Sequence, residues 1–142
     1  MSIKLNLGSG QHPLEGFMNL DAELGWCFED GLHQYQNEEV DAITVSHSLM
    51  YVREEDMLNV MQEFWRVLKP GGVVRITEDN THHWKWHGRN VDTTPELMFK
   101  YMTLAGFRVA DMEVNTTMYT DNSLIQEWHP KAVSFYIEGK KI

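Results

Sequence analysis

The chain contains little cysteine, few basic residues and no long apolar run. Cys27 is the only cysteine among 142 residues, so no internal disulfide can form, and a reducing compartment fits best. No apolar run reaches the roughly 18 residues that cross a membrane, and no charged-then-apolar leader opens the sequence. We therefore expect a cytoplasmic protein with no membrane partner.

Basic residues are scarce relative to acidic ones. Twelve Lys and Arg residues stand against 21 Asp and Glu residues, which gives a formal charge of −9 and a pI of about 5.1. Phosphate backbones are bound by basic surfaces, so we expect no nucleic acid partner. The length and an apolar content of 42% fit one compact domain over residues 1–142.

Hydrophobic periodicity predicts strands alternating with helices. Apolar and polar residues that alternate, and runs rich in β-branched residues, predict strands, whereas spacings of three and four predict helices. The strands are expected at residues 3–7, 17–20, 40–46, 73–77, 107–114 and 132–138, and the helices at 53–68 and 95–105, with mostly loop at 22–39 and 80–94. This alternation favours an open α/β sheet with parallel pairing, in which ligands bind beyond the carboxyl ends of strands. The residues expected to follow strands at that edge are Gly8, Asp21, Ser46 and Glu78.

Two glycines follow the first predicted strand in the stretch KLNLGSGQHP, residues 4–13. Glycine tolerates a positive φ and carries no Cβ to block a ligand, and exposed N–H groups at such a turn suit an anion. A P-loop is excluded because no Gly-Lys-Ser/Thr follows, and Pro13 stands where a dinucleotide fingerprint needs a third glycine. Asp21 ends the second strand, where an acid commonly accepts hydrogen bonds from ribose hydroxyls. An exposed aspartate that simply ends a strand is the alternative.

Several stretches together resemble class I S-adenosylmethionine-dependent methyltransferases, and most closely the small type with a shortened first crossover. They are LNLGSG at 5–10, GFMNLD at 16–21, VDAITVSHSLMYV at 40–52, EFWRVLKPGG at 63–72 and LAGFRV at 104–109. The resemblance implies a Rossmann-like open sheet, mostly parallel with an antiparallel last strand. Only ten residues separate Gly10 from Asp21, whereas a parallel crossover with a helix takes about a dozen or more. We therefore expect a compact fold without a full first helix, whose thinly covered sheet face could be covered by a partner subunit in a homodimer.

The resemblance implies S-adenosylmethionine as the cofactor and a role for each matching residue. The glycine loop would run along the methionine moiety, and Asp21 would hold the ribose hydroxyls. Asp30 to Leu32 would read the adenine, and Ser46 with His47 would line the opposite side. The cofactor residues implied in this way are Leu7, Gly8, Ser9, Gly10, Asp21, Asp30, Gly31, Leu32, Ser46 and His47. Trp26 and Tyr51 either flank the adenine or pack in the core.

Methyl transfer needs a general base only when the acceptor atom starts protonated. Asp79, at a strand end, is the first candidate for this base, and His82 or His83 is the second. Ordinary solvated loop residues are the alternative for each of the three. Histidines 82, 83 and 87 could ligate a metal, but they follow no strict ligand motif and have no cysteine nearby, so we expect no metal. Trp84 and Trp86 either wall a substrate pocket or pack the loop down.

The expected methyl acceptor is a small molecule, a sugar or a peptide side chain. The Asp/Asn-Pro-Pro-Tyr motif of amino-methylating DNA enzymes is absent, and no proline precedes Cys27 to make the nucleophile of cytosine C5 enzymes. A non-catalytic module that binds the cofactor or a partner is the alternative function. An enzyme that uses this fold on a nicotinamide or a nucleotide-sugar is a further rival, and Pro13 counts against the nicotinamide.

Overall fold

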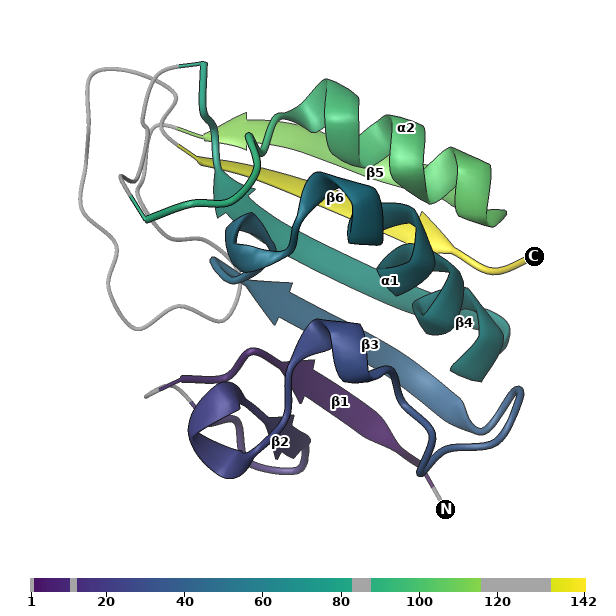
Figure 1. Ribbon diagram of the computed structural model, residues 1–142. Helices are drawn as coiled ribbons and strands as arrows, with labels where there is room; N and C mark the ends of the chain where they lie inside the picture. The colour runs from purple at the N-terminus through teal and green to yellow at the C-terminus, as the bar shows by residue number, and fades with distance from the viewer. Residues whose placement is uncertain (1, 11–12, 83–87, 116–133) are drawn as a thin grey trace.

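The computed structural model describes residues 2–10, 13–82, 88–115 and 134–142 (Figure 1). Six strands form one sheet in the order β2-β1-β3-β4-β6-β5. The strands are β1 (Lys4–Leu7), β2 (Met18–Leu20), β3 (Val40–Ser46), β4 (Leu68–Asp79), β5 (Arg108–Asn115) and β6 (Ser134–Lys140). The helices are α1 (Glu54–Val67) and α2 (Pro95–Ala105), and three 3₁₀ turns are η1 (Ala22–Leu24), η2 (Phe28–Asp30) and η3 (Leu49–Tyr51).

The sheet has the pairing that the sequence predicts. Strands β2, β1, β3 and β4 are parallel neighbours, and β6 runs antiparallel to both β4 and β5. The expectation of an open α/β sheet, mostly parallel with an antiparallel last strand, is confirmed. Between β1 and β2 the described residues form only turns and coil, so that part of the crossover carries no helix.

Local patterns located most elements to within two residues. Strand β3 and helix α2 have the predicted bounds, and α1 is one residue shorter at each end. The predicted start of the fourth strand at residue 73 is wrong, because β4 begins at Leu68, directly after α1. Leu68 pairs with Val40 and the register then shifts, so that Val73 pairs with Ala42. Gly71, with a φ of 85°, lets residues 69–72 bulge between these two pairings.

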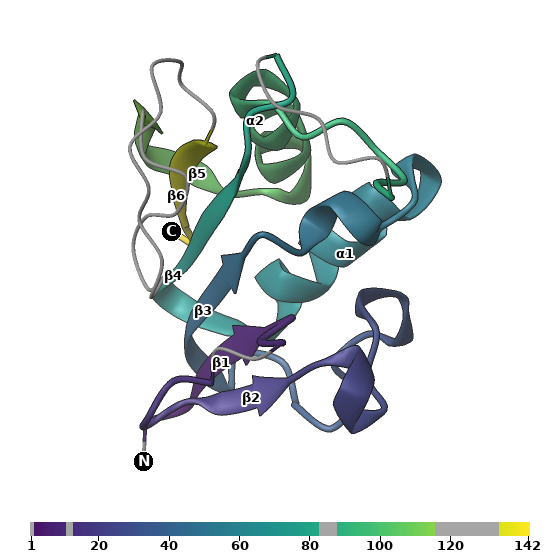
Figure 2. The ribbon, with the colours of Figure 1, turned by 90° about the vertical axis from the view of Figure 1, so that its left-hand side faces the viewer.

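Both helices lie on the same face of the sheet, as the two perpendicular views show (Figures 1 and 2). Helix α1 turns an apolar stripe at spacings of three and four toward the sheet, where Met57, Val60, Met61, Phe64 and Val67 are buried. The inward residues of the central strands complete this core. No helix in the described ranges is long and apolar enough to cross a membrane.

Candidate functional site

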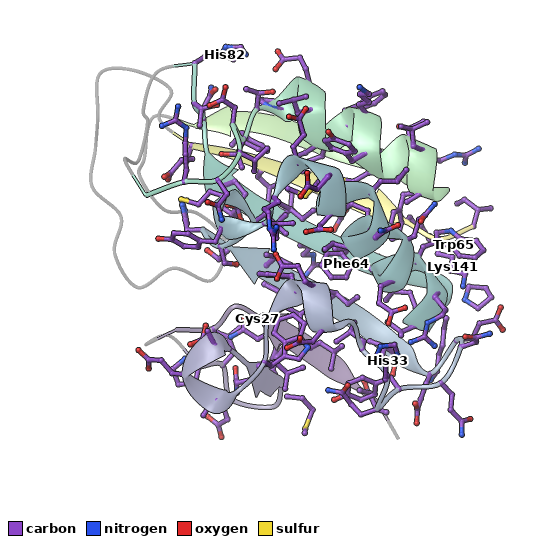
Figure 3. All side chains as sticks on the ribbon, in the orientation of Figure 1. Cys27, His33, Phe64, Trp65, His82 and Lys141 are labelled. Atoms are coloured by element: carbon purple, nitrogen blue, oxygen red, sulfur yellow. The ribbon has the colours of Figure 1, made fainter. Side chains whose placement is uncertain are left out.

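A cavity of about 320 Å³ opens beside the carboxyl ends of β1, β2 and β3. Because these strands are parallel, the residues that follow them meet at one edge of the sheet. The described lining residues are Gly8, Gly10, Asp21, Ala22, Trp26, Cys27, Phe28, Glu29, His47, Ser48, Tyr51 and Val52. Cys27, labelled in Figure 3, marks the wall that comes from the segment between η1 and η2.

Gly8 brings the end of β1 into close contact with the loop after β3. Its φ is 69°, and a β-carbon added there would come within 2.6 Å of the Ser48 Cβ. The N–H groups of Gly8 and Ser9 both donate to the carbonyl oxygen of Leu20, at 2.7 and 3.1 Å. The expectation that N–H groups in this loop are exposed for an anion is therefore wrong for these two residues, because strand β2 already uses them.

Asp21 stands at the rim of the cavity and also caps a 3₁₀ turn. Its Oδ2 accepts a hydrogen bond of 3.2 Å from the N–H of Glu23 at the start of η1. The carboxylate is partly exposed and lines the cavity. Both readings of this residue from the sequence are therefore compatible with its position, since it ends a strand and faces the cavity.

Four of the ten predicted cofactor residues line the cavity, namely Gly8, Gly10, Asp21 and His47. Leu7 and Ser9 are buried next to Gly8, and Ser46 is half-buried at the end of β3. These three belong to the segments that build the cavity, but they are not among its lining residues. The binding role of all ten stays a prediction.

The structure does not bring Asp30, Gly31 or Leu32 into this cavity. Asp30 and Gly31 line a neighbouring hollow of about 230 Å³, and Leu32 is fully buried with its N–H donating to Glu63 Oε2 at 2.7 Å. The preceding residues line the cavity instead, from Trp26 to Glu29. Residues 26–32 have no clear strand or helix pattern, so the sequence could not show that residues 26–29, rather than 30–32, line the cavity.

Three aromatic residues line the cavity, namely Trp26, Phe28 and Tyr51, and Trp26 also belongs to the core. The Trp26 ring is 8% exposed, donates through Nε1 to the carbonyl oxygen of Gly31 at 2.8 Å, and packs edge-on against Phe28. Tyr51 is half exposed at the rim. Sequence reasoning missed Ser48 and Phe28. Ser48 had a usable signal, because it directly follows His47 beyond a strand end.

Asp79 contacts His47, which lines the cavity. At the end of β4, its Oδ1 lies 2.9 Å from His47 Nδ1, and both side chains are about nine-tenths buried. His47 has a φ of 52°, and its N–H donates to the carbonyl oxygen of Thr77 at 2.7 Å. The first candidate base thus contacts a residue of the cavity wall, although it is not itself a lining residue.

His82 is not brought to the cavity. Its exposed ring lies 3.1 Å from Glu96 Oε2 at the start of α2, and in Figure 3 it is far from Cys27. His83, Trp84, Trp86 and His87 lie outside the described residues. Within the described ranges, no group of three His, Cys, Asp or Glu residues could hold a metal ion.

Glu78 is a fully buried carboxyl group beneath the cavity wall. Its Oε2 accepts a hydrogen bond of 3.0 Å from the N–H of Ser48, and among the described residues its Oε1 has no hydrogen-bond partner. Burial, and to a lesser extent the neighbouring Asp79, raise the pKa of Glu78 to about 8, against the lowering effect of the N–H groups of Ser48, Leu49 and Met50.

Comparison with known proteins finds one family model that matches part of the chain, and solved structures with a similar fold. A family model described as a methyltransferase domain matches residues 20–76. The fold is similar to that of a SAM-dependent methyltransferase from Archaeoglobus fulgidus, with a TM-score of 0.73 and 13% identity over 99% of this chain and 86% of that one. A search of curated protein sequences finds no significant match.

Two further solved structures show that the fold occurs in varied settings. The complex of the Haloferax volcanii Trm112 methyltransferase activator with a methyltransferase has a TM-score of 0.72 and 14% identity, over 98% of this chain and 82% of that one. The [4+2]-cyclase SpnF has a TM-score of 0.70 and 15% identity, over 99% and 74%. At these identities the likeness concerns the fold.

Proposed function

We propose that this chain, which has the fold of class I S-adenosylmethionine-dependent methyltransferases and matches a methyltransferase domain over residues 20–76, transfers a methyl group from S-adenosylmethionine. The resemblance to this family drawn from the sequence is thereby confirmed. The observation that carries the proposed function is the cavity at the sheet edge, because it unites the glycine loop, Asp21 and His47.

The cavity suits the parts of this cofactor. The backbone at Gly8 and Gly10 would face the methionine moiety, since no side chain stands in its way. The Asp21 carboxylate would accept hydrogen bonds from the ribose hydroxyls, and the Trp26 and Phe28 rings offer apolar area for the adenine. Among the described residues that line the cavity, Asp21 and Glu29 carry negative charge and none is Lys or Arg. This charge balance suits the positive sulfonium.

Methyl transfer from a sulfonium is an in-line displacement, in which the protein mainly aligns the reactants and replaces water. Where the acceptor must lose a proton, we propose that His47 and Asp79 receive it as a pair, because a carboxylate fixes the orientation of the imidazole. The proposed acceptor is a small molecule, a sugar or a peptide side chain.

Calorimetry with S-adenosylmethionine and S-adenosylhomocysteine tests the cofactor. Asn caps a 3₁₀ or helical turn about as well as Asp does, so Asp21→Asn keeps the fold while it removes the charge that would grip the ribose. We expect wild-type binding in the micromolar range and an affinity at least about tenfold lower in Asp21→Asn. Glu23→Gln, two residues away and exposed, is the matched control and should bind normally. Absence of binding by the wild type would refute the proposed function.

A panel of acceptors then separates an enzyme from a binding module. The likeness to a cyclase shows that a fold of this kind serves more than one named activity, so cofactor binding alone does not establish methyl transfer. We expect a methylated product with one acceptor class, and a lower kcat with little change in cofactor affinity in Asp79→Asn. Binding without any methylated product across the panel would favour the module.

A further inference from the structure

We propose that Glu78 is a positioning residue for the cofactor cavity, because its carboxyl group holds the segment that begins at Ser48 against the glycine loop. This inference rests on the proposed function, since the affinity for S-adenosylmethionine is what the positioning would set. Glu78 itself does not line the cavity. Glu78 would act on the cavity through Ser48, whose N–H it accepts and which lines the cavity.

The last two residues of β4 hold two consecutive residues of the cavity wall. Successive side chains of a strand point to opposite faces of the sheet. Asp79 contacts the ring of His47 on one face, and Glu78 accepts the N–H of Ser48 on the other. The two carboxyl groups together fix the turn by which the chain leaves β3 and enters η3.

Ser48 transmits its position directly to the glycine loop. Its Oγ lies 3.5 Å from the carbonyl oxygen of Leu7, and its Cβ occupies the space that a side chain at Gly8 would need. A shift of Ser48 therefore either opens a gap beside the loop or displaces its backbone. Ser48, Tyr51 and Val52 all line the cavity, so the same shift would change its shape.

Ionisation of Glu78 would weaken this arrangement. The groups that face its carboxyl from the segment 48–50 are backbone N–H groups, the residue opposite on β6 is Phe135, and the acidic neighbour is Asp79, which pairs with His47. Burial raises the pKa of Glu78 to about 8, so the carboxyl gains its charge as the pH rises through that value. A carboxyl group whose pKa is raised in the folded state stabilises that state less as the pH rises from the ordinary value of 4.5 toward the raised one. We therefore expect the cavity wall to become less firm as the pH rises toward about 8.

The test compares wild type with Glu78→Gln in calorimetric titrations of S-adenosylhomocysteine at several pH values from about 6.5 to 9.5. The amino group of the ligand titrates equally with both proteins, so the measured quantity is the ratio of the two dissociation constants. Gln has the shape of a neutral Glu and cannot ionise. We expect the ratio to be near one at the acid end and to reach about tenfold at the alkaline end, in favour of Glu78→Gln.

Glu55→Gln is the matched control, because it makes the same change at a side chain that is 73% exposed and outside the cavity. It should retain the wild-type dependence on pH. A ratio that stays constant across the range, with normal binding that depends on Asp21, would overturn the role of Glu78 and leave the proposed function intact. Failure of the wild type to bind either ligand would overturn both.

Amide hydrogen exchange of the wild type gives a second test that does not depend on the folding of the variant. After correction for the intrinsic base-catalysed rate, the protection of the Ser48 N–H should decrease as the pH rises toward about 8 and level off above it. A purely structural role for Glu78 would lower the stability of Glu78→Gln without any such change. Unchanged protection across this range would contradict the inference.

Discussion

The ammonium group of Lys141 lies 3.8 Å from the centre of the Trp65 ring and donates a hydrogen bond of 2.9 Å to the Trp65 carbonyl oxygen (Figure 3). The Lys141 side chain is only 4% exposed, and the carboxylate of Glu38 stands 3.9 Å away. A buried cation is tolerated when it is paired and hydrogen-bonded. This contact fastens the segment after β6 to the end of α1.

The first prediction concerns this contact. Lys141→Met keeps most of the apolar stem but removes the cation–π contact and the hydrogen bond, so we expect the free energy of unfolding to fall by about 1–3 kcal/mol. Lys140→Met is the control, because Lys140 is exposed, and its effect should stay within about 0.5 kcal/mol. Denaturant unfolding measures both. Equal losses in the two variants would show that the buried contact contributes nothing.

The second prediction concerns the contact between Gly8 and Ser48. Gly8→Ala introduces a β-carbon that would clash with Ser48 at a positive φ, so we expect both a loss of about 2–4 kcal/mol and at least about tenfold weaker cofactor binding. Gly16→Ala is the control, because its φ is 81° but its added β-carbon meets open space. It should show only the backbone strain of about 1–2 kcal/mol and unchanged binding.

A second substitution identifies the clash as the cause. Ser48→Gly removes the atoms that the new β-carbon would meet, so it should restore part of the cofactor affinity to Gly8→Ala. Calorimetry of the single and double variants measures this coupling. If the losses of binding free energy in the two single variants simply add in the double variant, the contact with Ser48 does not explain why residue 8 must be glycine.

The third prediction concerns Glu63, which joins α1 to the segment after η2. Its carboxylate accepts hydrogen bonds from Arg66 Nε at 2.6 Å and from the N–H of Leu32 at 2.7 Å. The hydrogen bond from Arg66 holds the pKa of Glu63 below its ordinary value of 4.5. A lowered pKa stabilises the folded state above the ordinary value, and this contribution is lost as the pH falls through the lower one.

Glu63→Gln should therefore cost about 1–3 kcal/mol near neutral pH, and the difference from the wild type should shrink in acid. Glu55→Gln is the control on the same helix, because the Glu55 side chain is 73% exposed and lies 3.6 Å from an equally exposed Arg53. Its effect should stay within about 0.5 kcal/mol. Unfolding at about pH 3 and pH 7 measures both differences, and a cost that is the same at both values would contradict the assigned cause.

Elements whose boundaries depend on local periodicity were predicted well. The apolar stripe of α1 and the β-branched run of β3 depend on neighbours within a few residues, so their bounds could be found without the rest of the chain. The start of β4 depends on pairing with Val40, which is 28 residues away, and no local pattern contains that information. Pro70, Gly71 and Gly72 in this stretch are typical of the end of a helix, so the sequence predicts a later start for the strand.

The candidate site divides in the same way. Gly8, Asp21 and His47 could be predicted because each follows a strand, and parallel strands bring their carboxyl ends to one edge. Asp30 lies at a neighbouring hollow, because its segment has no strand to fix it, and its binding role stays a prediction. Contacts of Glu63 and Arg66 with that segment, more than 30 residues apart in sequence at Leu32, decide where it lies.

The sequence by itself determined the class of fold, the edge at which the cavity opens and the residues that follow its strands, because hydrophobic periodicity and strand ends are local properties. Only the tertiary structure decided that Asp79 contacts His47, that Glu78 holds Ser48, and that His82 lies elsewhere. These pairs come from segments about 30 residues apart or from the far end of a loop. Their distances follow from the packing of whole strands and helices, which no short stretch of sequence encodes.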